Sequence, residues 1–132
     1  MTPSPITISP QTTLPEAHRL MEEHSIRRLP VLHKGKLIGL VTRGDLRGAQ
    51  ASDATTLSIY ELNYLLDRTP AKDFMAANPI TIAPTATLAE AAYLMLHHKI
   101  GGLPVIEADH LIGMLTETDL CRYLTLEQEM IE

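Results

Sequence analysis

The sequence has no tryptophan, one phenylalanine and four tyrosines, so aromatic residues make up only 4% of its 132 positions. A hydrophobic core must therefore be built from aliphatic side chains and methionine. The longest apolar run, AAYLML at 91–96, is far shorter than the roughly 20 residues of a membrane-spanning helix. We therefore expect a globular protein without a membrane partner.

Cysteine, positive charge and metal-ligand spacings are also scarce. The single cysteine, Cys121, excludes an internal disulfide, and the first ten residues do not resemble a secretion signal, so we expect a cytoplasmic protein. A net charge of −5 argues against a nucleic-acid partner, which needs a basic surface. The six histidines show no His-x-x-x-His or Cys/His spacing, so no metal site is predicted.

The main feature of the sequence is an internal duplication. A shift of 74 residues aligns positions 1–50 with 75–124, and 23 of these 50 positions are identical. PITISP aligns with PITIAP, and LIGLVTRGDL aligns with LIGMLTETDL. We predict repeat 1 at 1–50, a linker at 51–74, and repeat 2 at 75–132 with an extended C-terminal helix. Two such halves are expected to pack about a pseudo-twofold axis, because neither buries its apolar face well alone.

Each half predicts the element order β-α-β-β-α, which is an α+β (α/β-like) fold. Alternating residues at 6–8 and 80–82 predict short strands. Helices are expected to begin at TLPE and TLAE, where Thr13 and Thr87 start capping boxes, and to end near 24–26 and 98–100. A hairpin follows in each half, and the last helix begins at a Thr-x-x-Asp motif.

The linker segment LSIYELNYLLD at 57–67 is apolar over most of its helical circumference. Such a helix must be buried, against the rest of the chain or against a second subunit. Ser58 and Glu61 form a further potential capping box, and Pro70 is expected to stop the helix.

The two Thr-x-x-Asp motifs have two interpretations. A threonine followed three residues later by an acid, in front of a helix, satisfies the first backbone N–H groups and stabilises the helix by roughly 1 kcal/mol. Alternatively, the same hydroxyl and carboxylate bind a ligand at the beginning of that helix. The two roles are compatible, and the motif alone does not choose between them.

A tandem β-α-β-β-α repeat with L-P-V followed by G-h-h-T-x-x-D (h, an apolar residue) resembles the cystathionine-β-synthase (CBS) domain, and two copies resemble a Bateman module. The linker is similar to that of small stand-alone bacterial CBS proteins of the acetoin-utilisation type. The resemblance implies two clefts between the repeats that bind adenosine-containing ligands. It also implies a homodimer in which four repeats form a flat disc.

The resemblance further implies that each motif aspartate holds the ribose hydroxyls, while the threonine and the residue before the aspartate lie near phosphates. The first implied cleft combines Ile6, Ile26, Arg27, Arg28, Thr116, Thr118 and Asp119. The second combines Thr42, Gly44, Asp45, Ile80, Ile100, Gly101 and Gly102. Because two arginines can neutralise phosphates, the first cleft is the preferred site for a phosphorylated ligand, with Arg43 as a substitute cation in the second.

We therefore expect a regulatory module that senses AMP, ADP or ATP and has neither enzymatic activity nor a catalytic cofactor. Two alternatives remain open, a binder of S-adenosylmethionine and a ligand-free module for protein interaction or oligomerisation. A regulated enzyme or transporter is the expected partner.

Overall fold

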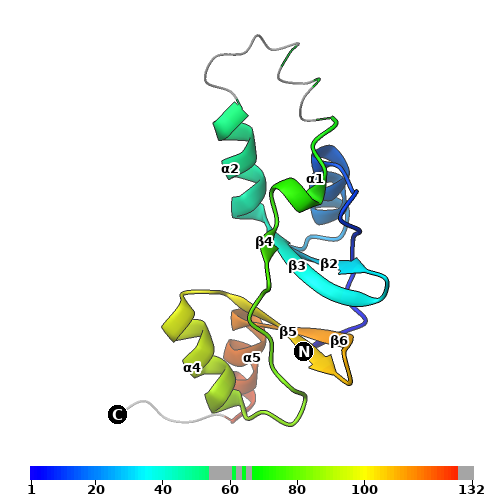
Figure 1. Cartoon of the computed structure of the whole chain (residues 1–132). Helices are drawn as coiled ribbons and strands as arrows, with labels where there is room; N and C mark the ends of the chain where they lie inside the picture. The colour runs from blue at the N-terminus through cyan, green and yellow to red at the C-terminus, as the bar shows by residue number, and fades with distance from the viewer. Residues whose placement is uncertain (54–60, 62–63, 65–66, 128–132) are drawn as a thin grey trace. The chain divides into compact units, whose positions relative to one another are not determined.

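A computed structural model describes residues 1–53, 61, 64 and 67–127 of the chain (Figure 1). The chain divides into two compact units. One consists of residues 6–79, and the other combines residues 1–5 with 80–132. They are called here the 6–79 unit and the 80–132 unit. Both mix helices with an antiparallel sheet, which confirms the predicted α+β class. Within the described residues, no helix has the length and apolar character needed to span a membrane.

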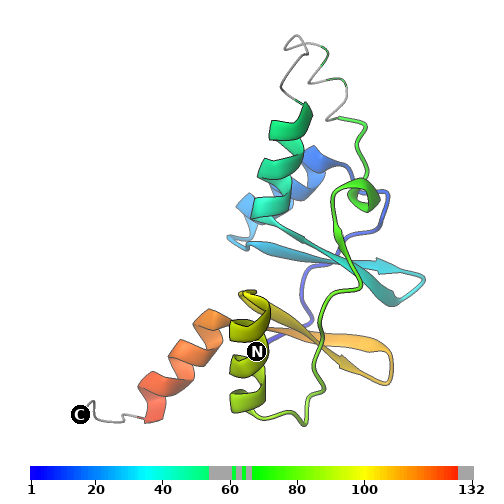
Figure 2. The ribbon, with the colours of Figure 1, turned by 60° about the vertical axis from the view of Figure 1, so that its left-hand side comes forward.

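In the 6–79 unit, two helices lie on one face of a three-stranded sheet (Figures 1 and 2). The sheet has the order β2-β3-β4, and a bulge interrupts the β2–β3 pairing at Val31/Leu32. The core between helices and sheet is aliphatic, as the scarcity of aromatic residues requires. The elements are α1 (Leu14–Glu23), β2 (Arg28–His33), β3 (Lys36–Thr42), α2 (Arg43–Asp53), the 3-10 helix η1 (Ala71–Asp73) and β4 (Ala76–Ala77).

The 80–132 unit repeats this arrangement with its own core. Its sheet has the order β1-β6-β5, with a bulge at the equivalent position, Val105/Ile106. Ala91 and Leu103 are fully buried at its centre. The elements are β1 (Thr2–Pro3), α4 (Leu88–His98), β5 (Gly102–Glu107), β6 (His110–Thr116) and α5 (Glu117–Glu127).

The third strand of each sheet comes from the beginning of the other sequence repeat. Thr2 pairs with Met114, so β1 completes the sheet of the 80–132 unit. In the same way Ala76 pairs with Leu40, so β4 completes the sheet of the 6–79 unit. The division into sequence repeats and the division into compact units are therefore different, because the residues that open each repeat pair with the sheet of the other.

Two glycines of the repeated LIG segment make room for this pairing. A Cβ on Gly39 would overlap the side chain of Met75 and lie 3.2 Å from the carbonyl oxygen of Ala76. A Cβ on Gly113 would meet Met1 in the same manner and lie 3.0 Å from the carbonyl oxygen of Thr2. The absence of a side chain thus allows a methionine to cover each sheet where the third strand begins.

The strands predicted at 6–8 and 80–82 are reduced to single bridges. Ile8 forms a parallel bridge with Val31, and Ile82 forms one with Val105. The N–H of Ile8 donates to Pro30 at 2.9 Å. In this register the next bond, toward Ile6 or Ile80, would need an N–H on Pro30 or Pro104, which proline lacks, so the predicted three-residue strands were wrong in length.

The two predicted helix caps behave differently. Thr87 accepts a hydrogen bond from the N–H of Glu90 at 3.0 Å, which confirms the predicted cap of α4. Thr13 precedes α1 with the same extended backbone, but its side chain makes no capping bond, so that prediction was wrong. The first amide of α1 has another acceptor, since the N–H of Leu14 donates to Thr69 at 3.1 Å, and Pro15 has no N–H to satisfy. Fewer free donors remain there to be capped.

The predicted linker helix at 57–67 lies largely outside the described residues. Within it, Glu61 and Tyr64 are helical, and Asp67 already belongs to a turn. Arg68 stacks on the ring of Tyr64, with its guanidinium carbon 3.7 Å from the ring centroid. Ser58, half of the proposed capping box, is not described.

Candidate functional site

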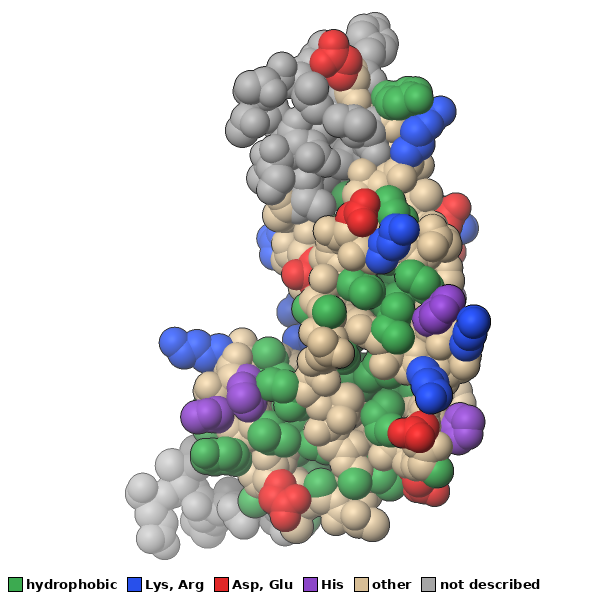
Figure 3. All heavy atoms as spheres, viewed as in Figure 1, with side chains coloured by type: hydrophobic (Ala, Val, Ile, Leu, Met, Phe, Trp, Pro, Cys, Tyr) green, Lys and Arg blue, Asp and Glu red, His purple; other side chains and the backbone are tan. Residues whose placement is uncertain are grey.

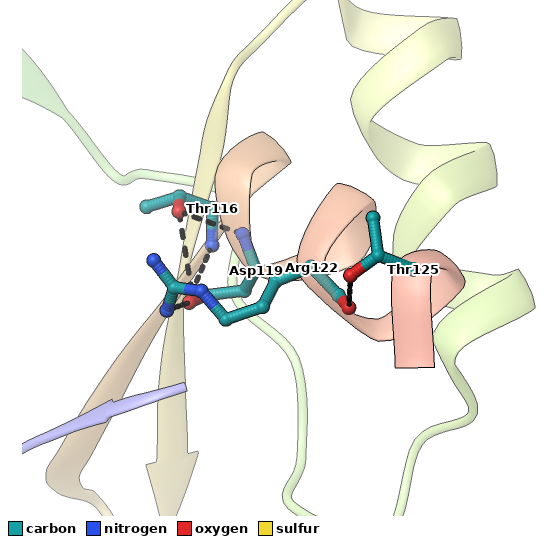
Figure 4. Close-up of polar contacts among 4 residues, drawn as sticks. All are labelled: Thr116, Asp119, Arg122 and Thr125. Atoms are coloured by element: carbon teal, nitrogen blue, oxygen red, sulfur yellow. Dashed lines mark hydrogen bonds and ion pairs between the residues drawn. The ribbon is translucent and has the colours of Figure 1, made fainter. Parts of the chain in front are cut away.

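Both Thr-x-x-Asp motifs form reciprocal helix caps. In the 6–79 unit, Asp45 Oδ2 accepts from the backbone N–H of Thr42 at 2.8 Å, and Thr42 Oγ1 accepts from the N–H of Asp45 at 3.1 Å. The other unit repeats these bonds between Thr116 and Asp119 at 2.9 and 3.4 Å (Figure 4). The capping interpretation is thus confirmed for both motifs.

Capping leaves part of each carboxylate available. The capping bonds that each carboxylate accepts go to one oxygen, Oδ2, and the hydroxyl of Thr116 also donates to Oδ2 of Asp119 at 3.2 Å. The other oxygen of Asp119, Oδ1, lies 3.7 Å from a guanidinium nitrogen of Arg122 (Figure 4). The side chain of Asp119 is 14% exposed. An ionised carboxylate has about four acceptor positions, so it can cap the helix and also accept from a ligand hydroxyl.

The start of each terminal helix is joined to the residues before the hairpin. Arg28 lies opposite Thr42 in the β2–β3 ladder, and the N–H of Arg43 donates to the carbonyl of Arg27 at 3.0 Å. In the 80–132 unit, Gly102 lies opposite Thr116, and the N–H of Glu117 donates to Gly101 at 3.1 Å. Each unit therefore has the same local backbone arrangement at the start of its terminal helix.

In the 6–79 unit this frame surrounds an open cavity of about 360 Å³. The volume is at the lower end of the range for small-molecule sites. Guanidinium groups form fork-shaped hydrogen bonds with phosphates and carboxylates, so the cavity suits an anion. Its lining consists of four arginines and two residues of the Thr-x-x-Asp motif: Arg27, Arg28, Arg43, Arg47, Thr42 and Gly44.

The cavity brings together residues that the sequence assigned to two different clefts. Arg27 and Arg28 were predicted in the cleft with Asp119, whereas Thr42 and Gly44 were predicted in the other. The antiparallel pairing of β2 with β3 joins them within one unit. Sequence reasoning missed Arg47, although its spacing of four residues from Arg43 places both on one side of α2.

The equivalent place in the 80–132 unit has different side chains on the same frame. Gly101 and Gly102 replace the arginine pair, and Gly102 is buried. Glu117 stands where Arg43 stands in the first unit, and Thr118 where Gly44 stands. Cys121, which is exposed, occupies the position equivalent to Arg47. This end therefore has no counterpart of the four cavity arginines and has one additional acid, Glu117.

The remaining predicted residues are apolar. Ile6 and Ile26 are partly buried against the core of the 6–79 unit, and Ile80 and Ile100 against the core of the other. Each predicted cleft combines residues of both units, so these combinations stay predictions. Among the described residues, no three His, Cys, Asp or Glu side chains come close enough to hold a metal ion.

Comparison with known proteins places this geometry in a family. The CBS domain model matches residues 1–52 and 71–126. A CBS domain-containing protein of Dictyostelium discoideum is 38% identical over 122 residues, which cover 91% of this chain and 84% of that protein. The chain therefore belongs to the CBS domain family, as a pair of CBS repeats.

Another relative is much longer than this chain. The inosine-5'-monophosphate dehydrogenase of Korarchaeum cryptofilum is 39% identical over 116 residues, which cover 87% of this chain. The match spans only 21% of that enzyme.

Solved structures of CBS pairs have the same fold over nearly the whole chain. The AcuB protein of Vibrio cholerae, named for acetoin utilization, has a TM-score of 0.79 at 35% identity and covers 100% of this chain and 94% of its own. CBSX2 in complex with AMP has a TM-score of 0.80 at 28% identity, with coverages of 98% and 95%. The CBS pair of protein MJ0100, in complex with 5'-methylthioadenosine and S-adenosylmethionine, has a TM-score of 0.78 at 25% identity, with coverages of 94% and 93%.

Proposed function

We propose that this chain is a regulatory module that binds an adenine nucleotide of the AMP, ADP or ATP class. The observation that carries the proposal is the arginine-lined cavity beside the Thr42–Asp45 cap. The AMP complex of CBSX2 supports the choice of ligand. S-adenosylmethionine, which MJ0100 binds, is the second candidate. Its sulfonium cation would be repelled by four arginines, which favours the phosphorylated ligand.

In this proposal the Oδ1 oxygens of Asp45 and Asp119, which take no part in the capping bonds to Oδ2, accept hydrogen bonds from ribose hydroxyls. Thr42, Gly44, Thr116 and Thr118 lie near the phosphates, with Arg27 and Arg28 as the cations. The base contacts the backbone around the hairpins and the apolar side chains of Ile6, Ile26, Ile80 and Ile100, together with Gly101 and Gly102. All fourteen predicted residues keep the roles that the family resemblance implies.

The experiment is thermal unfolding of the chain with AMP, ADP, ATP, S-adenosylmethionine or GTP. A ligand at about 100 times its dissociation constant stabilises the folded state by about 2.7 kcal/mol. Asp45→Ala and Asp119→Ala are compared with Asp73→Ala, which removes an exposed carboxylate outside the motifs. Each shift is measured from the variant's own ligand-free midpoint, because loss of a cap lowers that midpoint by itself.

An adenine nucleotide that raises the midpoint, with the shift lost in one motif variant and kept in Asp73→Ala, supports the proposal. Stabilisation by S-adenosylmethionine alone would transfer it to the second candidate. No shift with any compound at millimolar concentration would remove the ligand role and leave the motifs as helix caps.

A second candidate function, protein interaction and homodimer formation, is favoured by an apolar surface on the 80–132 unit. Figure 3 shows hydrophobic side chains gathered over α4. Leu96 is 81% exposed there, and Leu126 on α5 is 75% exposed. At the position equivalent to Leu96, the other unit has Glu22, which pairs with His18 at 3.3 Å. Large exposed apolar side chains are typical of contact surfaces.

Sedimentation measurements on Leu96→Glu test the homodimer, since this change copies the residue of the other repeat. We expect the variant to sediment as a monomer where the parent chain is a dimer, while Arg19→Gln on α1 leaves the dimer intact. A parent chain that is already monomeric would refute the homodimer.

We further propose that the chain works in the cytoplasm, without enzymatic activity of its own, and that it regulates an enzyme or a transporter according to the ligand it holds.

A further inference from the structure

The two Thr-x-x-Asp carboxylates differ in how many of their acceptor positions are already used. Among the described residues, Asp45 accepts one hydrogen bond, from the backbone N–H of Thr42 at 2.8 Å. Asp119 accepts the N–H of Thr116 at 2.9 Å and the hydroxyl of the same threonine at 3.2 Å. Its second oxygen, Oδ1, lies 3.7 Å from a guanidinium nitrogen of Arg122. Both oxygens of Asp119 therefore have a partner, whereas Oδ1 of Asp45 has none within the described part of the chain.

The difference comes from the residue three positions after each aspartate. On α5 this residue is Arg122, and side chains three apart lie on the same side of a helix. Figure 4 shows its guanidinium group turned back to the carboxylate of Asp119. On α2 the equivalent residue is Gly48, where even a Cβ would meet nothing within 4 Å. The structure thus has a cation that reaches one motif aspartate and no side chain at the same place beside the other.

Arg122 holds Oδ1 of Asp119 loosely. The carboxylate is 14% exposed, but the arginine side chain is 69% exposed. An ion pair with an exposed partner changes an equilibrium constant by roughly fivefold at most. A ribose hydroxyl that approaches Oδ1 meets the guanidinium group at the same oxygen, so the ligand gains less there than at an oxygen with no partner. The arginine therefore lowers ligand affinity at this motif without abolishing it.

We propose that Arg122 makes the two motifs unequal, so that the ligand binds first at Asp45, and at Asp119 only when the arginine has moved aside. The inference rests on the proposed nucleotide function, in which Oδ1 of each aspartate accepts from the ribose. It adds the order in which the motifs are filled and the residue that sets this order. The order is opposite to the preference drawn from the sequence for the cleft with Asp119, because that preference considered the phosphates and not the ribose acceptor.

The test is a titration of the full chain with adenosine, followed through the backbone amides in two-dimensional proton–nitrogen NMR spectra. The amide of Thr42 reports the Asp45 motif and that of Thr116 reports the Asp119 motif, because each donates to the aspartate concerned. One titration thus gives two separate affinities. Adenosine is the probe because it offers the ribose hydroxyls without a phosphate that a displaced arginine could bind.

Two reciprocal variants change the charge three residues after each aspartate. Arg122→Gln removes the cation and retains a good helix former, so adenosine should bind the Asp119 motif roughly two- to fivefold more tightly. Gly48→Arg gives α2 the residue of α5 and should weaken binding at the Asp45 motif by a similar factor. Gly48→Gln is the matched control without charge, and Arg19→Gln removes an exposed arginine of α1. Neither control should change either affinity.

Ionic strength gives a second measurement of the same contact. Salt screens an exposed ion pair, whereas adenosine carries no charge to be screened. Adenosine should therefore bind the Asp119 motif more tightly as the concentration of sodium chloride is raised, and this response should disappear in Arg122→Gln. AMP should lose affinity under the same conditions, because its own phosphate contacts are screened.

The outcomes separate this inference from the function on which it rests. Adenosine that binds both motifs of the parent chain equally well, or an Arg122→Gln variant with unchanged or weaker binding at Asp119, would overturn the inference and leave the nucleotide function in place. An equal effect of Gly48→Arg and Gly48→Gln would overturn it too. No response of either motif to adenosine, AMP or ATP, in the parent chain and in Arg122→Gln, would refute both.

Discussion

Gly39→Ala is expected to destabilise the protein by loosening the third strand from the sheet of the 6–79 unit. The new Cβ would stand 3.0 Å from Met75 Cγ, closer still to its sulfur, and 3.2 Å from the carbonyl oxygen of Ala76. A methionine side chain can move aside, but the carbonyl belongs to the ladder in which Gly39 pairs with Ala77. Extra atoms in a packed site cost about 1–3 kcal/mol, and we expect roughly 2 kcal/mol here.

The free energy of unfolding is measured by urea denaturation followed by far-ultraviolet circular dichroism, since the chain has no tryptophan to report by fluorescence. In thermal unfolding, a loss of about 2 kcal/mol corresponds to a thermal midpoint lowered by roughly 8 °C for a protein of this size. Gly48→Ala is the control. Its Cβ would meet nothing within 4 Å, and alanine on an exposed helix position should stabilise by about 1 kcal/mol.

A double-mutant cycle with Met75→Ala tests the cause. If the overlap with Met75 creates most of the cost, Gly39→Ala should be less harmful by about 1 kcal/mol or more when Met75 is already shortened. A Gly39→Ala variant as stable as the parent chain would refute the packing argument. An equal cost in both backgrounds would assign the effect to the Ala76 carbonyl instead of the methionine.

Three further predictions concern helix ends. Thr87→Ala should cost about 1 kcal/mol in urea denaturation because its capping bond is lost, whereas Thr13→Ala should cost clearly less; equal costs would contradict the difference between the two caps. Asp119→Ala removes the acceptor of two Thr116 donors, so it should lower the free energy of unfolding by about 1–2 kcal/mol even without ligand, and an unchanged value would show that the cap is dispensable. Lys99 ends α4 with φ of 56°, so Lys99→Gly should raise the thermal midpoint through a gain of roughly 0.5–1 kcal/mol, and a lower midpoint would refute the strain argument.

The local structure could be predicted because its signals lie within a few residues. The Thr-x-x-Asp motifs predicted where α2 and α5 begin, and each helix starts at the residue that follows the motif threonine. The alternation and turns around LPV and LIG predicted the two hairpins. Capping was predicted from spacing alone, and this failed at Thr13, where the N–H of Leu14 donates to the carbonyl of the distant Thr69.

The sequence by itself determined the duplication, the order of elements, the aliphatic core and the paired caps, because periodicity and spacing encode them locally. Only the tertiary structure decided that β1 and β4 complete the sheet of the opposite repeat. It also decided that Met75 and Met1 pack against Gly39 and Gly113, where a Cβ would overlap them. It also decided that four arginines share one cavity. The physical reason is the same in each instance: strand register and close approach are set by pairing between segments far apart in the chain, and no local pattern records that pairing.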